Sequence, residues 1–218
     1  MPYQLNKHSV EFAMSTSKFA TEIRRDQIAR VALEIIAAQG MKGFNVAAVA
    51  RRVGFAPSAV YHHFKGKDEI LDAVLDLLES TLKGNVVRAR RKGGDPIEQL
   101  RQLLVAHAQL VLGFSALPRL LFSDDIYGGN VSRKARLHAI ITGYLRDVAG
   151  IILDGQERGT IRAGLDPDTL SVMFLGLLQP TAILWHLSDG KFDAVGQMER
   201  AWPVFHDAIR ARSLNKAT

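Results

Sequence analysis

Tyr61, His62 and His63 stand side by side in the sequence, and their types are the first sign of chemistry in this chain. Imidazole rings bind zinc and transfer protons near neutral pH. Adjacent residues on a helix point about 100° apart, however, so His62 and His63 cannot bind one metal ion together. The chain also has no cysteine, which excludes thiolate metal sites, disulfides and a cysteine nucleophile. The cluster is therefore better explained as a contact surface than as a metal or catalytic centre.

The motifs of common enzyme classes are missing as well. The sequence contains no glycine-rich phosphate-binding loop, no HExxH and no GxSxG. We therefore predict that the protein is not an enzyme, with no catalytic residues, no bound metal and no cofactor.

Basic charge is uneven along the chain, which has a net charge of +6. Residues 1–92 hold 15 Lys and Arg against 9 Asp and Glu, whereas residues 93–218 hold 13 of each. A basic module suggests a nucleic-acid partner, because phosphate neutralisation supplies most of the affinity of such complexes. Ordinary solvated basic side chains are the alternative.

The composition is that of a folded protein that does not enter membranes. Of its 218 residues, 47% are hydrophobic, which is enough for a sizeable core. No segment has the roughly 18 uninterrupted apolar residues of a membrane span, and residues 1–20 lack the apolar block of a signal peptide. We therefore expect a cytoplasmic protein with no membrane partner.

Apolar residues recur at helical spacing through most of the chain. In the first part, the pattern predicts a helix around residues 28–36 that stops at Gly40 and a helix at 46–53 that is capped by Asn45 and ended by Gly54. It also predicts a helix at 57–64 that begins at Pro57 and a helix from Lys67 to about Arg91. Further starts are predicted at Asp95-Pro96, Asn130, Asp166-Pro167 and Asp193, and further stops at Gly113, Gly128-Gly129, Gly159 and Gly190. No segment alternates with the period of a strand, so we predict an all-α protein of about nine helices. Pro180 predicts a kink near residues 176–180.

Two short helices joined by a tight turn at Gly54 form a helix-turn-helix, whose second helix enters the major groove of DNA. Val60 and Phe64 must face inward, which leaves the other side of this helix for DNA. The predicted DNA-binding residues are on that side, at neighbouring helix starts and just before the first helix: Pro57, Ser58, Ala59, Tyr61, His62, His63, Asn45, Lys67, Arg24 and Arg25. Ala56 provides no side-chain cap at the start of the second helix.

Residues 24–75 resemble the N-terminal domain of the TetR (tetracycline-repressor-like) transcriptional regulators. The resemblance rests on the glycine after the first helix, the glycine at the turn, and a pattern made by Tyr61, His63, Phe64, Lys67 and Ile70-Leu71. It implies a homodimer of all-helical subunits, in which three N-terminal helices bind DNA and a C-terminal domain of roughly six helices usually binds a small effector. We therefore predict a mobile leader, residues 1–21, a DNA-binding domain, 22–66, and an effector-binding and dimerisation domain, 67–218.

Two features of the second half point to a ligand and to a partner subunit. His107 interrupts an apolar helical face and needs a polar partner or a ligand. The predicted effector-binding residues are His107, Phe114, His138, Tyr144, Phe174 and Trp185, although satisfied core or surface positions are the alternative for each. The predicted dimer-interface residues are Leu177, Thr181, Leu184, Met198, Trp202, Phe205 and Ile209, although such faces could also close the core of a monomer.

Together these observations favour a homodimeric repressor that a small, largely apolar effector releases from a pseudo-palindromic operator in double-stranded DNA. The alternative is a helix-turn-helix protein that binds or organises DNA under the control of a protein partner, with no small-molecule effector.

Overall fold

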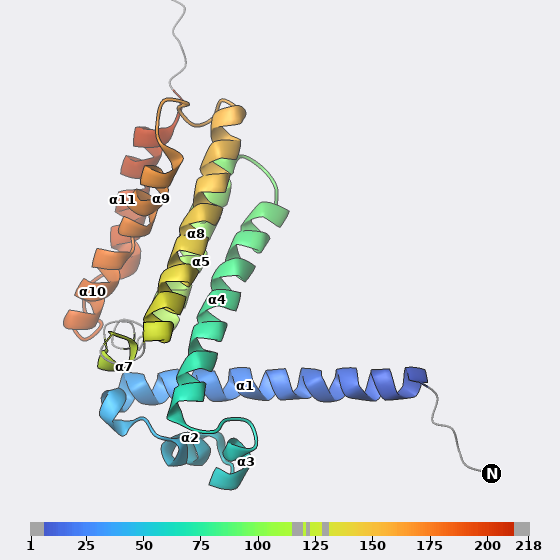
Figure 1. Ribbon diagram of the computed structural model, residues 1–218. Helices are drawn as coiled ribbons and strands as arrows, with labels where there is room; N and C mark the ends of the chain where they lie inside the picture. The colour runs from blue at the N-terminus through green and yellow to red at the C-terminus, as the bar shows by residue number, and fades with distance from the viewer. Residues whose placement is uncertain (1–6, 115–119, 121–122, 128–130, 212–218) are drawn as a thin grey trace, which may run out of the picture. The chain divides into compact units, whose positions relative to one another are not determined.

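The computed structural model describes residues 7–114, 120, 123–127 and 131–211, with side chains from residue 21 onward except that of Tyr127. These residues form helices joined by turns, with one isolated β-bridge between Ile161 and Arg210 (Figure 1). The all-α prediction is confirmed. The helix boundary predicted at Gly128-Gly129 and Asn130 lies outside the described residues.

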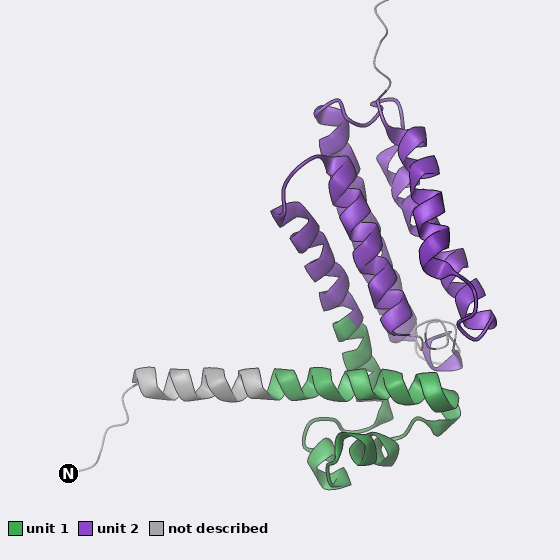
Figure 2. Ribbon diagram, turned by 180° about the vertical axis from the view of Figure 1, so that it is seen from behind, with its two compact units in different colours: residues 1–77 green, residues 78–218 purple. Residues whose placement is uncertain are grey.

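The chain forms two compact units, Met1–Leu77 and Leu78–Thr218 (Figure 2). The division falls inside helix α4, Lys67–Arg91, whereas the sequence analysis began the second domain at the start of this helix. The first turns of α4 carry three side chains that are completely or almost completely buried, Ile70, Leu71 and Val74. These turns belong to the core of the N-terminal unit.

The N-terminal unit contains α1 (Lys7–Gly43), α2 (Val46–Val53) and α3 (Pro57–Tyr61). Helix α1 begins at Lys7, so most of the predicted leader is helical. Gly40 has a φ of 70° and interrupts the helical backbone where the sequence analysis ended the first helix. Helix α2 packs against both α1 and α3. The buried face of α1 consists of Ile28, Ala29, Ala32, Leu33, Ile35 and Ile36.

The C-terminal unit contains α5 (Pro96–Gly113), α7 (Asp124–Tyr127), α8 (Val131–Glu157), α9 (Pro167–Gly176), α10 (Gln179–Leu187) and α11 (Ala194–Ile209). Three of these helices start as predicted, because the carboxylates of Asp95, Asp166 and Asp193 accept hydrogen bonds from free backbone N–H groups. Helix α8 packs against α5, α7 and α9, while α11 packs against α10 and α5.

The predicted kink near Pro180 is a full break. Helix α9 ends at Gly176 and α10 begins at Gln179, with Leu177 and Leu178 between them. Proline has no N–H to donate to the carbonyl four residues earlier, and its ring would collide with that carbonyl. By length and composition, Pro167–Leu187 is also the one segment among the described residues that is apolar enough to cross a membrane. It consists of these two separate helices, and both contribute to the core.

Candidate DNA-binding and effector sites

Gly54 makes the turn between the two short N-terminal helices. Its backbone is left-handed, with φ 80° and ψ 28°, a conformation that glycine adopts without strain. The N–H of Gly54 donates to the carbonyl of Arg51 at 3.3 Å, and the N–H of Phe55 donates to that of Ala50 at 2.9 Å. This pair of bonds is the Schellman arrangement, which satisfies the last carbonyls of α2. The chain therefore reverses sharply enough to present α3 as a separate helix.

Helix α3 has an inner and an outer side. Val60 and, just beyond the helix, Phe64 are buried, whereas Pro57, Ser58 and Tyr61 are exposed. The predicted helix over residues 57–64 is too long, because α3 ends at Tyr61. His62 is exposed and His63 half-buried in the turn that follows, and Ala59 is also half-buried. Ala56 makes no side-chain cap, as expected, and Pro57 occupies the first turn.

Arg25 and Arg24 have internal contacts. The guanidinium of Arg25 donates to the backbone carbonyl of His63 at 2.5 Å and lies 4.2 Å from the centroid of the Phe64 ring. The guanidinium of Arg24 lies 5.1 Å from the ring centroid of Phe55. The side chain of Arg25, one of the predicted DNA-binding residues, thus links α1 to the turn that follows α3.

The starts of α2 and α4 hold the two remaining DNA-binding candidates. The Asn45 side chain accepts a hydrogen bond from the N–H of Ala48 at 2.8 Å, so its oxygen caps α2. Lys67 is half-buried at the start of α4, where its ammonium lies 5.8 Å from the Phe44 ring centroid. The candidates that are exposed on or beside α3 are Pro57, Ser58, Tyr61 and His62.

The distribution of charge needs a correction once the units are known. Met1–Leu77 holds 10 Lys and Arg against 8 Asp and Glu, whereas Leu78–Thr218 holds 18 against 14. Much of the excess that the sequence analysis attributed to a DNA-binding module therefore belongs to the C-terminal unit. It comes from the basic second half of α4, whose place in that unit could not be read from the sequence.

His107 forms a hydrogen bond with Tyr144 within the C-terminal unit. Its Nδ1 lies 2.9 Å from the hydroxyl of Tyr144, and the two rings meet edge to face with centroids 5.1 Å apart. Both side chains are buried. Burial lowers the pKa of His107 to about 4 and raises the pKa of Tyr144, chiefly by desolvation. The pair is therefore neutral at physiological pH and joins α5 to α8.

Tyr144 also lines a cleft of about 280 Å³ between α4 and α8. The other predicted effector-binding residues differ in position. Phe174 is buried against Phe205, with ring centroids 6.0 Å apart, while Trp185 and Phe114 are half-buried. His138 is exposed on α8, so it does not line an internal pocket. Among the described residues, no group of three or more His, Cys, Asp or Glu side chains could bind a metal ion.

The predicted dimer-interface residues are divided between core and surface. Four of the seven lie inside the subunit: Thr181, Met198, Phe205 and Ile209. Met198, for example, packs with Ala108 and Leu178. Leu177 and Trp202 are half-buried, and Leu184 is exposed. The predicted set leaves out other exposed apolar side chains of α9, α10 and α11: Val172, Met173, Ile183, Leu187, Val195 and Val204.

A helix-turn-helix with an exposed recognition helix, joined to a larger helical unit, defines a DNA-binding transcriptional regulator. The chain belongs to the TetR family of bacterial regulatory proteins, whose model matches residues 28–74, while the model of the YsiA-like protein C-terminal region matches residues 95–208. The resemblance inferred from the sequence is thereby confirmed. Regulators of this family bind ligands through their C-terminal domains.

Similar proteins include a metabolism regulator and a nucleoid occlusion factor. The chain is 26% identical over 169 residues to the fatty acid metabolism regulator protein of Bacillus subtilis (strain 168), covering 78% of this chain and 87% of the relative. The crystal structure of the regulator FadR from Bacillus subtilis in complex with stearoyl-CoA has a TM-score of 0.68 and 25% identity, covering 84% of this chain and 98% of that one. The nucleoid occlusion factor SlmA of Vibrio vulnificus (strain YJ016) is 21% identical over 192 residues, covering 86% of this chain and 96% of the relative.

Proposed function

We propose that this protein is a homodimeric repressor that leaves its operator when the C-terminal unit binds a fatty acyl-CoA. The observation that carries the proposal is the similarity to FadR from Bacillus subtilis, whose structure contains stearoyl-CoA. The present chain covers 98% of the FadR chain. The similarity includes both the helix-turn-helix and the C-terminal domain. Because the target is genomic DNA, the proposal also places the protein in the cytoplasm.

The exposed surface of α3 supports the DNA-binding half of the proposal. Ser58, Tyr61 and His62 offer hydroxyl and imidazole groups that can reach base edges or phosphates in a major groove. Each subunit carries one such helix. A two-fold dimer presents two, about one DNA turn or roughly 34–36 Å apart, and therefore reads a pseudo-palindrome.

Exposed apolar side chains on α10 and α11 support the dimer. Leu187 and Val204 are 73% and 72% exposed, so a partner that covered them would remove apolar surface from water. A two-fold interface uses the same patch on both subunits, so one apolar surface of this kind is sufficient. Leu184, predicted from the sequence, is also exposed on α10.

The C-terminal unit has the character of an acyl-binding domain. Its core is mainly aliphatic and aromatic, and the neutral His107–Tyr144 pair is one of the polar groups buried within it. Small-molecule sites commonly combine an apolar lining with a few polar groups of this kind. Tyr144 lines a cleft whose other wall is α4, and α4 continues into the N-terminal unit. An effector that prefers one position of α4 would shift the population between DNA-bound and released states.

The similarity to the nucleoid occlusion factor SlmA favours a second candidate function. In this reading the protein organises DNA under the control of a protein partner and responds to no acyl-CoA. At 21% identity, the similarity is lower than that to the fatty acid metabolism regulator.

A mobility-shift experiment with stearoyl-CoA tests the proposal and separates the two functions. The operator is first isolated by sequencing genomic fragments that the purified protein retains. Stearoyl-CoA at micromolar concentration should release the labelled operator, whereas free CoA and stearate should release it poorly. Operator binding that is insensitive to acyl-CoAs of every chain length contradicts the proposal and favours the second function.

A further inference from the structure

The second half of α4 carries more positive charge than its own contacts explain. Residues 78–92 contain five cations and one carboxylate, which belongs to Glu79. Two of the five cations have carboxylate partners: Lys83 pairs with Glu79, and Arg90 pairs with Asp154 at 2.8 Å. Cations stabilise the C-terminal end of a helix, which explains part of this bias. It does not explain why two of the remaining cations line a cleft.

That cleft lies between α4 and α5 and has a volume of about 470 Å³, within the range of small-ligand sites. Its lining residues are Asn85, Arg88, Ala89, Lys92, Glu98, Arg101, Gln102, Val105, Ala106 and Gln109. Three of them are cations, and Glu98 is the single carboxylate. Within the described part of the chain, Lys92 has no ion-pair partner, and Arg101 reaches Glu98 only at 3.9 Å.

Two polar groups give this cleft the character of a formed site. Asn85 is only 3% exposed, and its side-chain oxygen accepts a hydrogen bond from the guanidinium of Arg88. A buried amide therefore fixes the direction of a cation in the cleft. Gln102 donates to Glu98 at 3.2 Å, but its own side-chain oxygen is buried without a hydrogen-bond partner among the described residues. Such an unsatisfied acceptor costs free energy unless a ligand or water supplies a donor.

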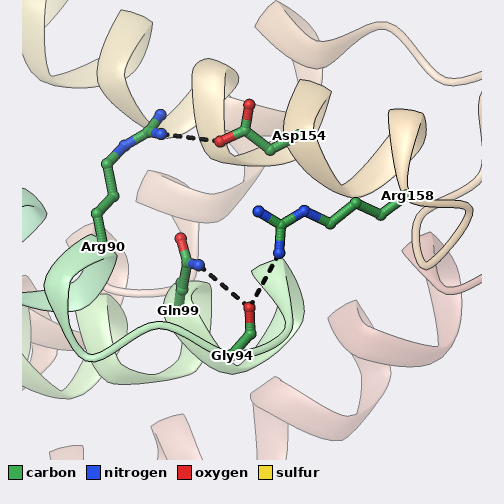
Figure 3. A network of polar contacts seen from close by, with 5 residues as sticks. All are labelled: Arg90, Gly94, Gln99, Asp154 and Arg158. Atoms are coloured by element: carbon green, nitrogen blue, oxygen red, sulfur yellow. Dashed lines mark hydrogen bonds and ion pairs between the residues drawn. The ribbon is translucent and has the colours of Figure 1, made fainter.

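The end of the cleft is held in place by the contacts in Figure 3. The carbonyl of Gly94, in the turn between α4 and α5, accepts hydrogen bonds from Gln99 at 3.4 Å and from Arg158 at 3.3 Å. Arg90 joins the last turns of α4 to Asp154 of α8. Helix α5 itself packs against α8, so both walls contact this helix. A site of fixed shape loses less entropy when it binds a ligand.

We propose that the α4–α5 cleft binds the phosphate groups of a nucleotide-bearing ligand, with Arg88, Lys92 and Arg101 as its cations. Guanidinium groups bind phosphate oxygens through paired, charge-assisted hydrogen bonds. The unsatisfied oxygen of Gln102 would accept an N–H from the same ligand. The inference rests on the proposed function, since the nucleotide end of an acyl-CoA carries both phosphates and N–H donors. A free nucleotide shares this chemistry and is the other source of such a ligand.

Calorimetric titration tests the site with stearoyl-CoA, CoA, ATP and inorganic phosphate as probes. The double variant Arg88→Gln/Arg101→Gln should bind CoA and stearoyl-CoA at least about tenfold more weakly than the wild type, because each lost guanidinium removes charge-assisted bonds. Arg91→Gln is the matched control, since Arg91 lies at the same end of α4 and outside the cleft lining. Circular dichroism establishes that both variants are folded.

The outcomes distinguish the site from the proposed function. CoA affinity that is unchanged in the double variant, or that falls equally in Arg91→Gln, overturns the site. If stearoyl-CoA does not release the operator but CoA binds the wild type and not the double variant, the proposed function fails and the site stands. ATP binding as tight as that of CoA, and lost in the double variant, also supports the site and identifies a free nucleotide as the ligand.

Discussion

Acid should destabilise this protein through one buried histidine. The folded-state pKa of His107 is about 4, below the value of 6.5 expected in the unfolded chain. As the pH falls, the unfolded chain therefore binds a proton before the folded one does. The stabilising contribution is fully present above pH 6.5 and is lost as the pH falls towards 4. At 1.36 kcal/mol per pKa unit, the loss is about 2 kcal/mol at pH 5 and about 3 kcal/mol when complete.

The substitution His107→Gln isolates this effect. Glutamine does not titrate and can keep a hydrogen bond to Tyr144. Urea unfolding, followed by circular dichroism at one fixed protein concentration, gives the free energy of unfolding at pH 8 and pH 5. The decrease between these pH values should be about 2 kcal/mol smaller in the variant than in the wild type, because other titrating groups cancel in the difference. His138→Gln, at an exposed position, is the control for the loss of one histidine.

Equal decreases in the wild type and in His107→Gln would refute the reasoning. They would mean that the imidazole takes up its proton equally well in both states, so that its burial between α5 and α8 has no energetic consequence.

Three further predictions concern the DNA-binding surface, the turn and the interface. Tyr61→Ala should weaken operator binding about tenfold or more in a mobility-shift assay and change the free energy of unfolding by less than about 0.5 kcal/mol, because Tyr61 is 56% exposed. Gly54→Ala should lower the free energy of unfolding by about 1 kcal/mol through its positive φ alone, since no atom lies within 4 Å of the added carbon. Gly84→Ala, inside α4, should raise the free energy of unfolding. If both variants change the free energy of unfolding in the same direction, the argument about the turn is wrong. Leu187→Asp should convert the dimer to a monomer in size-exclusion chromatography with light scattering, whereas Val131→Asp, also highly exposed, should not; a dimer in both variants removes the interface proposal.

Local signals in the sequence were sufficient to predict the N-terminal fold. A glycine in a left-handed conformation and a proline in the first turn act within a few residues, so Gly54 and Pro57 located the turn and the recognition helix. The aspartate caps located three later helix starts for the same reason. Helix α3 ends earlier than predicted. The burial of Val60 and Phe64 does not require the residues between them to be helical, so their spacing could not locate the end of the helix.

Features that depend on distant parts of the chain were less predictable. The sequence indicated that His107 needed a partner, but Tyr144, 37 residues away, was one candidate among several. The last helices are apolar on more than one side, so periodicity could not tell core from surface. Met198 and Phe205 were therefore assigned to an interface although they lie in the subunit core, and Leu187 was missed. The cleft between α4 and α5 exists only because two helices pack side by side, and no short sequence pattern indicates such packing.

Because both compact units share helix α4, the length of this helix is constrained in a way that the length of a loop is not. A residue inserted into a loop lengthens a flexible connection. A residue inserted near Leu77 would instead rotate the part of the chain that follows by about 100° about the helix axis and shift it by about 1.5 Å along that axis. Such a change would alter the orientation of one compact unit relative to the other without changing the residues of either core. Insertions and deletions acquired during divergence should therefore be rarer in α4 than in the exposed turns that join other helices.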